Sequence, residues 1–163
     1  MAATVYLRVL TGSARHVASG SITGFNFLSS DTYDYSASTR NAYPVTLGNL
    51  SFEKALQGYI SVSPANKVEN FQFWCDGTFM TGTCVLVGTS ADAFTTSVST
   101  TSGVATSDMS GFDSGAKVSW DSASYSAVGS IATLLILQLD TNAATGSPGD
   151  WTQETFSWSY DEQ

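Results

Sequence analysis

The chain has 163 residues, of which 42% are hydrophobic and only 12% are charged, and its formal net charge is −8. This length fits a single domain, residues 1–163, with a substantial core. Six Lys and Arg residues are too few to neutralise a run of phosphates, and an acidic surface is repelled by anionic lipid, so we expect neither a nucleic-acid nor a membrane partner.

Serine and threonine make up more than a quarter of the chain and separate most of its apolar runs. Their side chains compete for helical backbone hydrogen bonds, so this composition favours strands and turns. The longest apolar run, residues 131–139, is too short to cross a bilayer as a helix, and the first ten residues lack the charged and apolar regions of a signal peptide. We therefore expect a soluble all-β protein.

The first predicted strand covers residues 5–10. The aliphatic side chains of Val5, Leu7 and Val9 alternate there with positions that include Tyr6 and Arg8. This period of two predicts one face in the core and the other toward solvent.

A second alternating segment and a long loop follow. Residues 20–28, GSITGFNFL, place Phe25 and Phe27 on one side of a predicted strand. Residues 29–49 read as a long surface loop, with a short edge strand possible over residues 43–47.

Residues 50–64, LSFEKALQGYISVSP, fit either a helix or a strand. A helix could begin at a serine cap, whereas a strand would place Leu56 and Ile60 on its apolar face with Lys54 as the exception. Gly58 weakens a helix, so the strand is favoured.

Residues 70–90, NFQFWCDGTFMTGTCVLVGTS, contain both cysteines of the chain, Cys75 and Cys84. Phe71, Phe73 and Cys75 project to one side of a predicted strand, and CVLVG forms the next strand. The Asp-Gly and Thr-Gly turn signals between them predict a hairpin. A wide hairpin would bring the two cysteines opposite each other and allow a disulfide, whereas a tight turn would not.

The second half of the chain ends in its clearest strand patterns. Residues 89–115 are expected to hold up to two weak strands, and residues 116–124 another. Residues 131–140, IATLLILQLD, are apolar on both faces, which is typical of a central strand. The final segment alternates three aromatic residues with polar ones and predicts a closing strand; they are Phe156, Trp158 and Tyr160. Together these elements predict an antiparallel β-sandwich, jelly-roll-like, with about seven to ten strands.

The sequence offers few groups for catalysis. Its one histidine, His16, would have to carry any Ser-His-Asp triad alone, and no nucleophile-elbow, phosphate-loop or zinc-protease motif is present. A glycosidase pair could in principle come from Glu69 with Asp76 or from Glu154 with Asp161. Most aspartates instead lie in loops beside Ser or Gly, where an Asp side chain caps turns. We assign no catalytic, cofactor-binding or metal residue and expect a protein that is not an enzyme.

Two weaker binding hypotheses remain. Residues 107–115 and 140–150 each gather several oxygens, but neither has the spacing of a calcium-binding EF-hand loop. Trp120 and Trp151 could stack on sugars in a carbohydrate-binding module, or all four tryptophans could fill a sandwich core.

Four segments together resemble a known class of protein. They are SFEKAL (51–56), KVENFQFWCDG (67–77), VLVGTS (85–90) and LLILQLDTNAATGSPGDWTQETFSWSYDE (134–162). Their order is similar to that in small β-sandwich structural proteins of tailed-phage virions, of the decoration or cement type. The resemblance covers about the C-terminal two thirds of the chain and brings no catalytic or metal residues with it.

The resemblance implies a non-enzymatic virion protein. As a capsid decoration protein it would bind the major capsid protein or other virion subunits, form a homo-oligomer and reside in a virion assembled in the host cytoplasm, without a cofactor. The alternatives are a carbohydrate- or receptor-binding module of a fibre, or a tail or baseplate subunit. A reducing cytoplasm favours free thiols at Cys75 and Cys84 over a disulfide.

Overall fold

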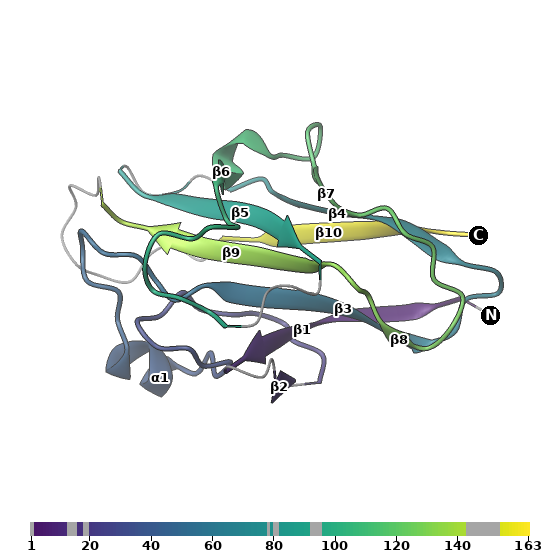
Figure 1. Cartoon of the computed structure of the whole chain (residues 1–163), viewed down its shortest axis with the longest axis horizontal. Coiled ribbons are helices and arrows are strands. Elements are labelled where there is room, and N and C mark those ends of the chain that lie inside the picture. The colour runs from purple at the N-terminus through teal and green to yellow at the C-terminus, as the bar shows by residue number, and fades with distance from the viewer. Residues whose placement is uncertain are drawn as a thin grey trace.

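The chain folds into two antiparallel sheets that pack face to face (Figure 1). A computed structural model of the chain describes residues 2–12, the backbone of 16–17, and residues 20–77, 79, 82–91, 96–142 and 154–163. The larger sheet contains seven strands: β1 (Thr4–Thr11), β2 (His16–Val17), β3 (Lys54–Val62), β5 (Cys84–Ser90), β6 (Ser107–Asp108), β8 (Gly129–Ser130) and β9 (Leu134–Asp140). The smaller sheet contains β4 (Val68–Cys75), β7 (Val118–Asp121) and β10 (Phe156–Glu162), and a short helix α1 (Ala37–Ala42) and a 3₁₀ turn η1 (Met109–Gly111) lie in the connections. The described residues thus form ten strands, which confirms the all-β sandwich.

From β3 onward, the chain alternates between the two sheets. The chain passes from β3 in the larger sheet to β4 in the smaller one, returns to β5, and repeats this crossing through β7, β9 and β10. The predicted hairpin between β4 and β5 is therefore wrong, because β4 pairs with β10 and β7 while β5 pairs with β9 and β6. Both strands have an apolar stripe, and each buries it by facing the other across the core rather than by lying beside it.

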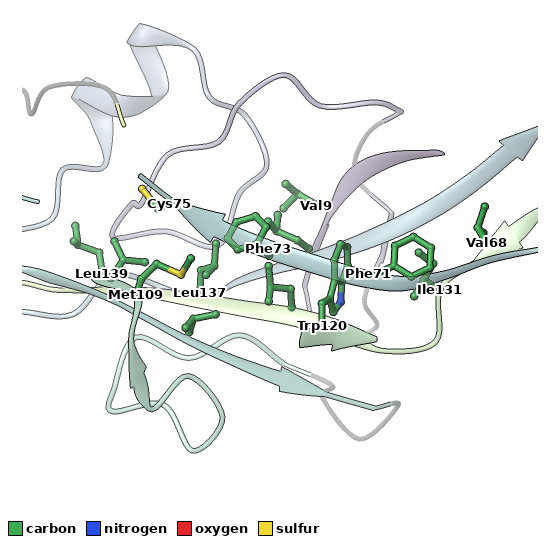
Figure 2. Close-up of a cluster of buried hydrophobic side chains, with 14 of the residues drawn as sticks. Val9, Val68, Phe71, Phe73, Cys75, Met109, Trp120, Ile131, Leu137 and Leu139 are labelled. Atoms are coloured by element: carbon green, nitrogen blue, oxygen red, sulfur yellow. The ribbon is translucent and has the colours of Figure 1, made fainter. Parts of the chain in front are cut away.

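The core fills the space between the sheets (Figure 2). Phe71 and Phe73 from β4 are at most 1% exposed, and they meet Leu135 and Leu137 from β9 within one cluster. The prediction for β9 is confirmed, since it lies between β3 and β5 with six consecutive buried residues. The predicted closing strand β10 is also confirmed, and its three aromatic side chains pack against this core.

A second, smaller core lies on the outer face of the larger sheet. Residues 97–105 cross that face, where Ala105 packs with Leu134 and Ile136. Gln138, fully buried on β9, ties this covering segment down by accepting a hydrogen bond from Ser102 N and donating to the carbonyls of Val98 and Thr100. One half of the outer face is thereby covered.

Two predictions for the first third of the chain are wrong. Residues 20–28 form no strand, although Phe25 and Phe27 do pack against the core as their spacing indicated. Their backbone is held instead by single hydrogen bonds, such as the one from Ile22 N to Leu7 O at 3.0 Å. Residues 43–47 form no edge strand, and α1 precedes them in the loop. The apolar pattern marked burial correctly, but burial does not require ladder pairing.

Two other uncertain segments are resolved. Residues 54–62 form the strand β3, which confirms the preference for a strand over a helix. Residues 96–115 contain only the two-residue strand β6 and the turn η1.

Candidate interaction surface

The open half of the larger sheet's outer face presents five polar or aromatic side chains, which we call the Arg8 patch. Its members come from β1, β3 and β8, and they are Tyr6, Arg8, Gln57, Tyr59 and Ser130. They are half-buried or, for Ser130, exposed. The antiparallel register sets Tyr6 opposite Tyr59 and Arg8 opposite Gln57, so the strand alternation that buries Val9 and Leu56 turns these side chains outward.

The guanidinium of Arg8 is held in one orientation. Its Nε and Nη2 donate to Gln57 Oε1 at 3.1 and 2.7 Å, and Nη2 also donates to Ser130 Oγ at 2.6 Å. The guanidinium carbon lies 4.5 Å from the centre of the Tyr59 ring, which in turn packs 5.4 Å from Tyr6. Stacking and hydrogen bonding together fix the side chain before any partner arrives.

The hydrogen-bond donors of Arg8 that remain unused indicate which group the patch can bind. Among the described residues no group accepts a hydrogen bond from Nη1, and no carboxylate forms an ion pair with the guanidinium. A fixed guanidinium with donors to spare suits a carboxylate or another anion. The sequence analysis placed Arg8 on the solvent face correctly, but the strand pattern alone did not reveal how firmly it is held.

The lysines that the structure describes have surroundings different from those of Arg8. Lys67 pairs with Glu69 at 2.7 Å, and Lys117 lies 4.4 Å from the ring centre of Trp74 on the smaller sheet. The hydrogen bond from Lys67, and after it the one from Ser124, hold the pKa of Glu69 below its usual range.

Lys54 is the most unusual ionisable group of the described chain, with only 1% of its surface exposed. Its Nζ donates to Thr32 O at 2.7 Å, and burial lowers its pKa to about 8, while the nearby Asp31 carboxylate acts in the opposite direction. The Oδ2 atom of Asp31 accepts from Gly12 N, whereas Oδ1 is buried without a partner in the described structure. The strand pattern had already marked Lys54 as a cation on an apolar face.

A second exposed feature is a tyrosine-bearing loop around α1. Tyr33, Tyr35 and Tyr43 are 48%, 49% and 46% exposed. Hydrogen bonds, first from the Thr39 side chain and then from the Ser36 backbone, lower the pKa of Asp34 and fix the loop between the tyrosines.

Beside this loop lies a shallow depression of about 240 Å³. It is lined by Ser29, Val45, Thr46, Asn49, Leu50 and Ser99. Ser29 is tied to the tyrosine loop, since its N–H donates to Tyr43 O at 3.0 Å.

The structure does not bring either candidate carboxylate pair together. Glu69 lies in β4 and Asp76 directly after it, seven residues further along an extended chain; Glu154 precedes β10 and Asp161 lies within it, at the same spacing. Each pair is therefore separated by roughly 20 Å rather than the about 5–10 Å of a glycosidase. Asp76 accepts hydrogen bonds from Trp74 Nε1 and Ser114 N. The backbone of His16 lies in β2, and its side chain is outside the described residues.

The two oxygen-rich loops use their carboxylates as turn caps where they are described. Asp108 Oδ1 accepts from Ser110 N, and Asp113 Oδ1 accepts from Gly115 N and Ala116 N. Residues 143–150 of the second loop lie outside the described part of the chain. Within that part, no three His, Cys, Asp or Glu side chains gather closely enough to hold a metal ion.

The sugar-stacking hypothesis for Trp120 is wrong. The side chain is only 2% exposed, packs against Phe71, and donates from Nε1 to Thr133 O at 2.9 Å (Figure 2). Trp151 lies outside the described residues.

The two cysteines are free thiols, as the sequence analysis favoured. Cys75 ends β4 in the smaller sheet, whereas Cys84 begins β5 in the larger one. Burial raises the pKa of both thiols, which makes them poor nucleophiles at neutral pH.

Comparisons with known proteins return no match: no family model fits the chain, and neither the curated proteins nor the solved structures include a significant relative. None of the helices in the described ranges is long and apolar enough to span a membrane.

Proposed function

We propose that this chain is a non-enzymatic structural protein of a tailed-phage virion, a capsid decoration protein that binds the head lattice through the major capsid protein. The four segments that carry the resemblance support this proposal, since they supply the start of β3 and most of β4, β5, β9 and β10, long strands on both sides of the core. A framework of this kind leaves the sheet faces and loops free to differ between relatives.

The observation that carries the proposal is the Arg8 patch. A protein that works by presenting a surface benefits from an area whose polar groups are already oriented, because each side chain ordered on binding costs affinity. The Arg8 patch has these properties, and arginine and tyrosine are enriched at the centres of interfaces.

Binding to phage heads tests the proposal. Purified chain is mixed with heads that lack it, unbound protein is removed by sedimentation, and the heads are examined by electron microscopy and heated. We expect stoichiometric binding at symmetric positions of the lattice and a higher temperature of head disruption. Density on the tail would instead identify a tail or baseplate subunit, and absence of the chain from every virion fraction by mass spectrometry would disprove a virion role.

A second candidate function is binding of a glycan receptor by a fibre module. The tyrosine loop favours it, because Tyr43 is exposed next to a depression lined mainly by uncharged hydroxyl and amide groups, and such groups stack on and hydrogen-bond to neutral sugars. A glycan array with wild-type protein and Tyr43→Ala tests this function. Binding that is lost in the variant supports it, and an empty array counts against it.

A further inference from the structure

We propose that the Arg8 patch docks an Asp or Glu carboxylate of a neighbouring virion subunit, with Arg8 Nη1 as the donor that remains for it. This inference rests on the proposed function and names the chemistry of the contact. The occupant is an acidic protein surface rather than a second copy of an apolar strand.

The geometry of Arg8 prepares it for this contact. Gln57 and Ser130 occupy Nε and Nη2, so the two N–H groups of Nη1 are left without an acceptor among the described residues. The Tyr59 ring, 4.5 Å from the guanidinium carbon, adds a cation–π contact that helps to hold the side chain in this orientation. A carboxylate can therefore bind without first ordering a long, flexible side chain.

The charge distribution favours a carboxylate. The other members of the patch are neutral, while the chain as a whole carries −8. Arg8 therefore forms a local cationic point on an acidic protein, which attracts a carboxylate.

Other anions fit the patch less well. A nucleic acid would need a row of cations to release its counterions, and the patch offers one. The aromatic neighbours Tyr6 and Tyr59 supply apolar contact area around the charge, as at the centre of a protein interface.

Three variants test the contact on heads. Arg8→Gln removes the charge, and we expect it to weaken binding about tenfold to a hundredfold and to reduce the dependence of binding on salt. Arg8→Lys keeps the positive charge but lacks the planar, forked set of guanidinium donors, so its affinity should lie between those of Arg8→Gln and the wild type. Lys117→Gln is the matched control, because it also removes a cation that lies over an aromatic ring, but on the smaller sheet. It should bind like the wild type.

The outcomes separate the two proposals. If wild type and Arg8→Gln bind heads equally, the docking inference is wrong and the virion role stands. If wild type binds no particle, the virion role fails, and the carboxylate site is decided by an NMR titration of the protein with tetraglutamate, using tetraglutamine as the neutral control. Shifts of the Gln57 side-chain amide with tetraglutamate alone, lost in Arg8→Gln, support the site. Absent or Arg8-independent shifts overturn it.

Discussion

Replacing Lys54 with methionine should change how stability depends on pH. In the wild type the ammonium is buried with one hydrogen bond, to Thr32 O, and burial lowers its pKa to about 8 from a reference value of 10.5. Methionine has a similar length and no charge. The variant therefore isolates the free energy of keeping this charge in the core.

The magnitude follows from the difference in pKa between the folded and unfolded states. A gap of about 2.5 pH units, at about 1.4 kcal/mol per unit, corresponds to about 3 kcal/mol. Between pH 8 and 10.5 the unfolded chain binds more protons at this position than the folded chain, so the stability of the wild type rises with pH in that window. Below pH 8 both states are protonated and the full penalty applies.

Urea unfolding of both proteins at pH 7 and pH 10.5 measures the effect, because the titrations common to both cancel in the difference. We expect the stability of Lys54→Met relative to wild type to fall by about 3 kcal/mol between these pH values. Lys117→Met, which removes a half-buried ammonium from the smaller sheet, is the control and should show no comparable change. A pH-independent difference for Lys54→Met would refute the assignment of a desolvated lysine.

Three further predictions concern the packing, the hydrogen bonds of Asp121 and the reactivity of the thiols. Gly88→Ala should destabilise the fold by about 1–3 kcal/mol, because the added Cβ would lie 1.9 Å from the carbonyl oxygen of Val104, in the segment that covers the sheet. Gly103→Ala is the control and should be nearly neutral, because no atom lies within 4 Å of its Cβ position. Thermal unfolding compares the two variants. Asp121→Asn should cost about 1–3 kcal/mol in a urea titration, since the carboxylate accepts three hydrogen bonds at one end of the smaller sheet, and an unchanged midpoint would contradict this. Cys75 and Cys84 should react with a thiol reagent much more slowly in the native than in the unfolded protein, and an intact mass 2 Da lower in the absence of reductant would show a disulfide instead.

Local sequence patterns predicted the long strands well. Period-two alternation identified β1, β4 and β10, and the doubly apolar run identified β9 as central. These strands could be predicted because the alternation of apolar and polar side chains shows which face of a strand is buried. The same rule placed Tyr6 and Arg8 on the solvent side, so part of the candidate surface was accessible to prediction.

The sequence by itself therefore determined the all-β class, the buried faces of the long strands and the acidic, lightly charged surface. Only the tertiary structure decided that β4 and β5 lie in opposite sheets, that Trp120 is buried, and that Gln57 and Ser130 fix Arg8. The physical reason is that strands pair through backbone groups that every residue shares, so the pairing depends on contacts between residues far apart in the chain. The hydrogen bond from Arg8 to Ser130 spans 122 positions, and no local pattern records it.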